Sequence, residues 1–112
     1  MANPSRLLLV HTTVGDREQA ARIGRTLVEE HLAACVSIVD GAESIYPWQG
    51  RIERARETGL LIKTTASGFE TLARRLRELH PYELPELLAT EVVEADPGYA
   101  QWLRDWIEHK QD

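Results

Sequence analysis

The chain has 112 residues, of which 43% are hydrophobic and 28% are charged, a composition typical of one globular domain and not of a disordered or low-complexity protein. Its net charge of -5 argues against nucleic acid or an anionic membrane as the main partner. The single cysteine, Cys35, cannot form an internal disulfide, and no apolar run is long enough to span a membrane. We therefore expect a cytoplasmic protein with one domain over residues 1–112, of which residues 1–5 form a polar N-terminal tail.

The first elements in chain order are a strand and a helix. Residues 6–13 are apolar until a polar end, which is typical of a short buried strand. Asp16 can cap a helix over residues 17 to about 32, where apolar side chains recur at helical spacing. We expect this helix to pack on the sheet.

A long hairpin follows. Residues 35–39 and 44–48 read as one strand that is interrupted by an irregularity at Asp40-Gly41, and Gln49-Gly50 is a hairpin turn. The returning strand runs over residues 52–65, but its first part is too polar for a core strand. We therefore expect that part of the hairpin to project from the domain as an arm.

The second half predicts a helix, a strand and a closing helix. Residues 67–70 have the pattern of a capping box, and the helix that follows should stop at Pro81. Residues 84–93 read as a last strand, and Asp96-Pro97 starts an aromatic C-terminal helix. The order strand, helix, strand, strand, helix, strand predicts an α+β, ferredoxin-like sandwich with an additional C-terminal helix.

This topology predicts where polar side chains gather. For the sheet order 4-1-3-2 we expect the first and third strands to be parallel, so that their ends lie beside the start of the fourth strand. That edge would bring together His11, Lys63, His80 and Glu83. Two kinds of site are compatible with such a group.

The first is a metal site. The imidazoles of His11 and His80 could hold copper or zinc, with Glu83 or Cys35 as a further ligand. The competing interpretation is that these histidines only terminate a strand and a helix.

The second is a site for a small anionic ligand, held by Lys63, by the hydroxyls of Thr12 and Thr64 and by helix amides. The threonines could equally be structural. The sequence has no motif for an organic cofactor and no recognised catalytic motif, so we expect a protein that is not an enzyme.

Four segments in order resemble the CutA divalent-cation tolerance family: Ala33-Ala34-Cys35-Val36, Ile45-Tyr46-Pro47-Trp48-Gln49-Gly50, Leu61-Ile62-Lys63-Thr64-Thr65 and His80-Pro81-Tyr82-Glu83-Leu84-Pro85-Glu86. The resemblance covers about residues 6–107. It implies a ferredoxin-like subunit in a tight homotrimer, with extended hairpins that add strands to neighbouring subunits, as in the signal-transducing PII proteins.

The resemblance also implies cytoplasmic metal tolerance and binding of copper or other divalent cations. The matching positions should line clefts between subunits, and they are Cys35, Trp48, Lys63, His80, Tyr82 and Glu83. His11 stands where some relatives place a cysteine, which keeps a ligand but lowers the preference for the softest ions. The leading hypothesis is thus a trimeric cation-binding protein, and the alternative is a PII-like sensor of a small anionic ligand.

Overall fold

The computed structural model describes residues 5–109, so the predicted polar tail lies outside the described residues except for Ser5. Its elements are, in chain order, β1 (Leu7–Val14), α1 (Arg17–Glu29), β2 (Cys35–Trp48), β3 (Arg51–Thr65), a 3-10 turn (Ala66–Gly68), α2 (Phe69–Leu79), β4 (Leu88–Glu91) and α3 (Pro97–Glu108). This order confirms the α+β, ferredoxin-like arrangement with an additional C-terminal helix.

The four strands form one sheet in the order β2-β3-β1-β4, as predicted, and every neighbouring pair is antiparallel. The expected parallel pairing of the first and third strands is therefore wrong. The crossover through α1 makes β2 parallel to β1, and the tight turn after β2 then reverses the chain. Strand β3 returns between them and must run opposite to both.

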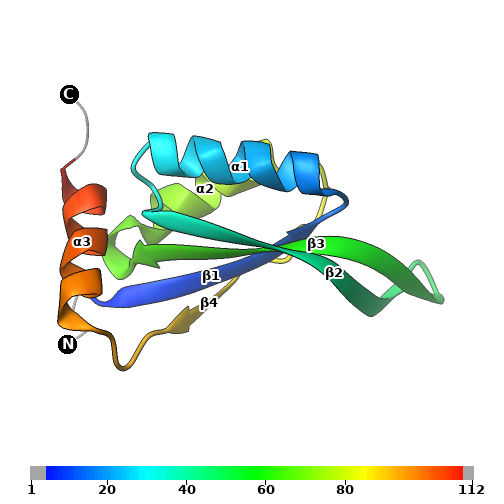
Figure 1. Ribbon diagram of the computed structural model, residues 1–112. Helices are drawn as coiled ribbons and strands as arrows, with labels where there is room; N and C mark the ends of the chain where they lie inside the picture. The colour runs from blue at the N-terminus through cyan, green and yellow to red at the C-terminus, as the bar shows by residue number, and fades with distance from the viewer. Residues whose placement is uncertain (1–4, 110–112) are drawn as a thin grey trace.

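Helices α1 and α2 cover one face of this sheet, and α3 lies across one end (Figure 1). None of the described helices covers the other face. Every second side chain of β1 and β3 points toward the two helices, which places Val10 and Ile62 in the core beside Leu27, Leu72 and Leu76. A smaller apolar cluster connects α3 to the end of the sheet.

The observed helix ends agree with two of the predicted caps and differ from a third. Asp16 caps α1 by accepting a hydrogen bond from the Gln19 amide at 2.8 Å, and Asp96 caps α3 in the same way. Helix α1 ends at Glu29, three residues earlier than about residue 32, and His31 then adopts a left-handed backbone with φ 61°. The capping box predicted over residues 67–70 is wrong, because the helix starts later, at Phe69, with no side-chain cap.

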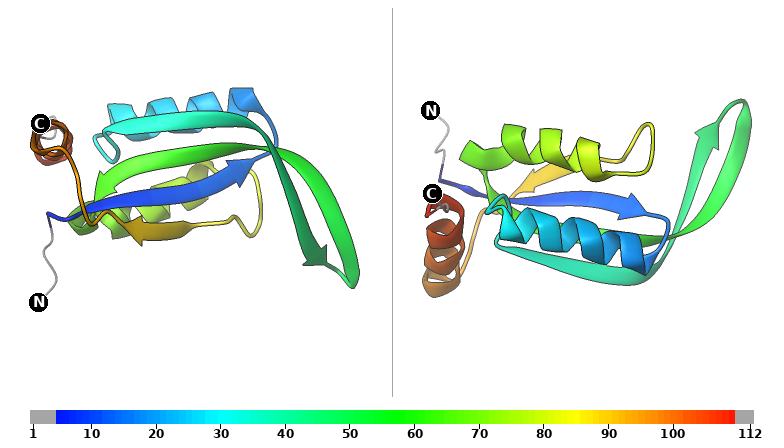
Figure 2. Two further views of the ribbon diagram at one scale, coloured as in Figure 1. Left: turned by 60° about the horizontal axis from the view of Figure 1, so that its bottom comes forward. Right: turned by 90° about the horizontal axis from the view of Figure 1, so that it is seen from above.

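The hairpin of β2 and β3 extends well beyond the helices, and its outer part curves away from the sheet (Figure 2). A bulge between Val39 and Ala42 marks the point of departure, with Gly41 at φ 85°. At the tip, Gln49 and Gly50 both have positive φ, as a two-residue hairpin turn requires. The projecting arm and its turn are thus confirmed.

Candidate functional site

A groove lies between the arm and the segment that follows α2. Its volume is about 820 Å³. One wall comes from residues 44–48 of β2, and the other comes from residues 82–86. Thr13 at the end of β1 and Glu57 at the base of the arm also line it. Of the predicted site residues, Trp48, Tyr82 and Glu83 lie here.

Glu57 is the polar centre of this groove. The hydroxyl of Tyr82 donates a hydrogen bond of 2.6 Å to its Oε2, although Glu57 is only 7% exposed. Burial by itself raises the pKa of Glu57, but hydrogen bonds from Ser44, Tyr82 and Thr13 outweigh it, so that the pKa is lowered. The carboxylate is therefore charged at neutral pH.

The same carboxylate affects Tyr82. Burial, first, and then the hydrogen bond to Glu57 and its negative charge raise the pKa of the Tyr82 phenol above its ordinary value. Tyr82 thus stays a neutral donor across the physiological range, and the ring is fixed as one wall of the groove.

His80 holds this wall in place. Its Nε2–H donates to the carbonyl of Thr13 at 2.8 Å, and its Nδ1 accepts from the amide of Tyr82 at 3.1 Å. Burial lowers the pKa of His80, against the opposing effects of the Thr13 carbonyl and the Glu57 charge. The imidazole is neutral, and both of its nitrogens are already bonded to the backbone.

His11 lies two residues before Thr13 on β1, and the two side chains lie on the same face of the strand. Its neighbours Val10 and Thr12 are buried under the helices, so that His11 points to the uncovered face of the sheet. There its Nε2 lies 3.4 Å from Thr90 Oγ1. Within residues 5–109 no group of three or more His, Cys, Asp or Glu side chains is placed to hold a metal ion.

Cys35 and Lys63 are paired across β2 and β3, and Lys63 lies four positions along β3 from Gly59, the partner of Thr13. Lys63 Nζ donates to Ser37 Oγ and lies 3.6 Å from Cys35 Sγ. Thr64 instead points into the core, where its hydroxyl donates to the Leu32 carbonyl at 2.8 Å.

The predicted gathering of His11, Lys63, Thr64 and His80 at one edge is therefore wrong as a whole. Lys63 pairs with Leu9, which is four positions along β1 from Thr13, the residue whose carbonyl His80 contacts. His11 pairs with Leu61 between these two points and lies on the same face of the sheet as Lys63. The single edge depended on parallel strands.

Sequence reasoning missed the central place of Glu57. The residue stands in the polar stretch that predicted the arm, and nothing in its neighbours distinguishes it from Glu53. In β3 it lies on the same face as Glu53, and the bulge in β2 places Ala42 opposite it. Its hydrogen-bond partner Tyr82 is 25 positions later in the chain.

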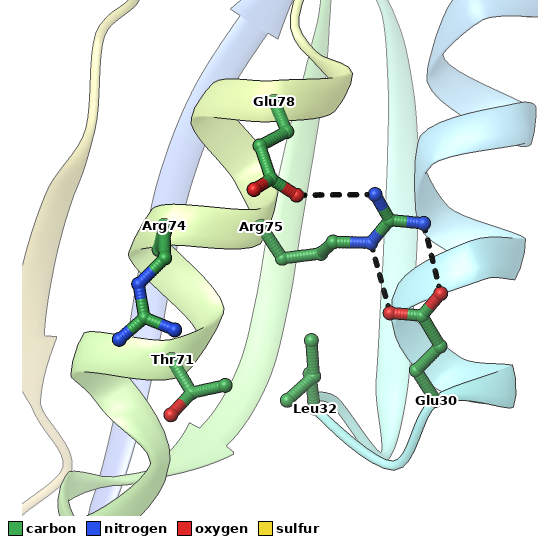
Figure 3. A pocket seen from close by; sticks show the side chains of 6 residues that line it. All are labelled: Glu30, Leu32, Thr71, Arg74, Arg75 and Glu78. Carbon is green, nitrogen blue, oxygen red and sulfur yellow. Dashed lines mark hydrogen bonds and ion pairs between the residues drawn. The ribbon is translucent and has the colours of Figure 1, made fainter.

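A second hollow, between the end of α1 and α2, is filled by its own ion pairs (Figure 3). The guanidinium of Arg75 binds both carboxylate oxygens of Glu30 at 2.9 Å and also contacts Glu78 at 3.2 Å. These hydrogen bonds raise the pKa of Arg75 further above its already high value. These contacts link the end of α1 to α2, and they already occupy the Arg75 guanidinium, the strongest hydrogen-bond donor of the hollow.

None of the described helices is both long and apolar enough to cross a membrane. Residues 8–106 match the model of the CutA1 divalent ion tolerance protein family. The chain belongs to the CutA1 family. The resemblance seen in the four sequence segments is thus confirmed.

Two relatives and one solved structure show the extent of the match. The chain is 46% identical over 97 residues to the divalent-cation tolerance protein CutA of Thermus thermophilus, which covers 87% of this chain and 94% of that protein. It is 37% identical over 98 residues to the chloroplastic protein CutA of Arabidopsis thaliana, which covers 88% of this chain and 54% of that protein. The crystal structure of CutA from Xylella fastidiosa, at 44% identity, superposes with a TM-score of 0.89 over 91% of this chain and 98% of that one. The CutA1 fold therefore holds for nearly the whole chain.

Proposed function

We propose that this CutA1 family member is a non-enzymatic protein that binds divalent cations of the copper or zinc type and acts in metal tolerance as a cytoplasmic, single-domain homotrimer. The observation that carries the proposal is the position of His11. Its imidazole lies on the sheet face that no helix covers, with one long contact to Thr90. It is thus a borderline ligand that a metal ion can reach without unfolding the core.

A site of two to four ligands then needs contributions from more than one subunit, because the described residues of one chain provide no group of three. His11 is the leading ligand of the proposed set. His80 would have to give up a backbone hydrogen bond, and Cys35 and Glu83 lie elsewhere on the chain. We therefore expect Cys35 and Glu83 to assist only where subunits meet.

Trimer formation is supported by apolar side chains that a single chain leaves exposed. Six of them lie on the arm, the uncovered face and the segments flanking β4: Val39, Ile45, Ile52, Leu84, Leu88 and Val93. Strand β4 is short, and within residues 5–109 it pairs with β1 alone, so its outer edge is open to a strand from another subunit. Light scattering should give a mass near three times 12.7 kDa, and a mass of one chain would contradict the trimer.

Calorimetric titration with Cu²⁺ and with Zn²⁺ tests cation binding. We expect saturable binding that is lost in His11→Ala and in the double variant His11→Ala, His80→Ala. His109→Ala is the matched control, since it removes an exposed histidine at the end of α3 and should leave binding unchanged. Binding that survives in the double variant would contradict the proposed ligands.

The alternative is a PII-like sensor of a small anionic ligand. Lys63 favours it, because its ammonium group lies on the uncovered face beside Ser37. Thr64 does not share that position, since its hydroxyl is bound to Leu32 in the core, and Trp48 and Tyr82 lie in the groove instead. Titration with ATP and inorganic phosphate should show binding that Lys63→Ala abolishes if the alternative holds.

If neither metal nor anion binds, a scaffold that binds another protein remains. The cytoplasmic location is tested separately, by cell fractionation, since the Arabidopsis relative is named as chloroplastic.

A further inference from the structure

The groove between the arm and residues 82–86 is negatively charged. Three glutamates line it, Glu57, Glu83 and Glu86, and its lining includes no lysine, arginine or histidine. None of the three glutamates takes part in an ion pair with a lysine or arginine in the part of the chain that the structure describes. An occupant of this groove should therefore carry positive charge.

One of these three glutamates, Glu57, is buried, so the negative charge of the groove is not confined to the surface. It is 7% exposed, it accepts a hydrogen bond from the Tyr82 hydroxyl, and it forms no ion pair with a lysine or arginine among the described residues. A cation bound here would supply the charge partner that the described residues do not provide. The groove thus has a fixed negative centre at its inner end.

The rest of the lining is aromatic. Tyr46 and Trp48 come from the arm and Tyr82 from the facing segment, and Pro47 and Pro85 add rigid apolar surface. Trp48 is 43% exposed and Tyr46 38%, so part of each side chain remains open to an occupant. Ring faces attract cations whose charge is weakly hydrated, which favours an organic ammonium group.

A bare metal ion fits this groove poorly. A metal site needs two to four ligands, and the described residues contain no group of three His, Cys, Asp or Glu side chains placed to hold an ion. The volume of about 820 Å³ lies in the range of small-molecule sites.

We propose that the groove binds a small organic cation between the aromatic rings and the Glu57, Glu83 and Glu86 carboxylates. The cationic group is a protonated primary amine or a quaternary ammonium. This ligand class differs from the metal ion and from the anion considered above. It also uses residues other than His11 and Lys63.

Choline is a suitable probe, with its uncharged isostere 3,3-dimethyl-1-butanol as the matched control. Titration of the intact, assembled protein should show saturable choline binding by calorimetry and by tryptophan fluorescence. We expect the isostere to bind at least about tenfold more weakly, because it keeps the shape and loses the charge. Equal binding of the two compounds would overturn the proposal, as would an absence of choline binding up to about 10 mM.

Variants locate the site. Trp48→Leu and Glu57→Gln should each weaken choline binding at least about tenfold, and Glu86→Gln should weaken it less, because that carboxylate is more exposed. Trp102→Leu is the control, since Trp102 is 51% exposed on α3 and does not line the groove. Thermal unfolding of each variant checks that it is folded. Unchanged binding in folded Trp48→Leu and Glu57→Gln would also overturn the proposal.

Two further measurements separate the groove from other sources of binding. His11→Ala should leave choline binding intact, so that failure of the metal proposal and failure of this one are distinguishable. Phosphatidylcholine vesicles distinguish a free amine from a lipid headgroup. Choline-sensitive cosedimentation with vesicles assigns the headgroup, and its absence, with choline bound, assigns a free ligand.

Discussion

The hairpin of β2 and β3 has two halves that share continuous backbone pairing but differ in side-chain burial. In the inner half, residues 35–39 with 59–63, one face of the pair lies under α1 and buries Leu60 and Ile62. In the outer half, residues 42–48 with 51–57, the same ladder continues, but Ile45 and Ile52 are 67% and 74% exposed. Strand pairing therefore extends beyond the core, and side-chain burial stops where the helix layer stops.

Polar contacts, rather than apolar packing, connect the two halves to the domain at their junction. Asp40 at the bulge binds Arg17 of α1 at 2.6 Å, and Glu57 on the opposite strand binds Tyr82. We infer from this difference that the inner half sets stability, that the junction sets the position of the arm, and that the outer half serves contacts with other molecules. The predictions below test this division and begin with the substitution that should cost the most stability.

The largest effect should come from the core under the inner half. Leu27→Ala leaves a cavity below the sheet and should lower the free energy of unfolding by about 2–5 kcal/mol in denaturant titrations. Ile52→Ala on the arm should cost less than about 0.5 kcal/mol within a single chain. A larger loss together with a lower mass in light scattering would show that a second subunit covers the arm. Equal losses in the two variants without a change of mass would contradict the claim that the inner half, and not the arm, sets the stability of a single chain.

The junction should show an intermediate effect. Tyr82→Phe removes the donor to the charged, buried Glu57 and should lower the free energy of unfolding by about 1–2 kcal/mol. Tyr46→Phe is the control on the arm, and it should cost less than about 0.5 kcal/mol. If both substitutions have the same small effect, the Glu57–Tyr82 hydrogen bond does not hold the junction.

The core under the inner half contains one unsatisfied polar group, on the neighbouring strand β1. Thr12 is buried, and its hydroxyl is the only buried side-chain polar atom among residues 5–109 without a hydrogen-bond partner. Thr12→Val keeps the shape and should raise the free energy of unfolding by up to about 1 kcal/mol. Thr64→Val, which breaks the bond to Leu32, should lower it by about 1 kcal/mol. Stabilisation by both substitutions would mean that neither hydroxyl is used in the folded chain.

The smallest effect should be a pH dependence at the junction. Because burial lowers the pKa of His80 below its ordinary value of 6.5, the unfolded chain binds a proton more readily than the folded chain does. This contribution to stability is complete above pH 6.5, and it is lost as the pH falls from 6.5 through the lowered pKa. Urea titrations at several pH values across this range give the free energy of unfolding as a function of pH. That free energy should change less steeply with pH in His80→Gln than in the parent chain. Identical slopes would contradict a neutral His80 in the folded protein.

The sequence by itself determined the order of the elements, the caps at Asp16 and Asp96, the end of α2 before Pro81 and the turn at Gln49-Gly50. These features follow from side-chain periodicity and from the backbone preferences of a few residues, which act over short stretches of chain. The polar outer strand was also enough to predict the arm, and the four family segments were enough to predict CutA1 membership.

Only the tertiary structure decided which side chains meet. The direction of β3 depends on the crossover through α1 and on the tight turn together, and it places Lys63 away from His80. The hydrogen bond between Tyr82 and Glu57 joins positions 25 residues apart, and the bulge in β2 decides which residues of the outer strand lie opposite Glu57. Such contacts join positions far apart in the chain, and a shift of one residue turns a side chain to the opposite face, so local sequence patterns do not specify them.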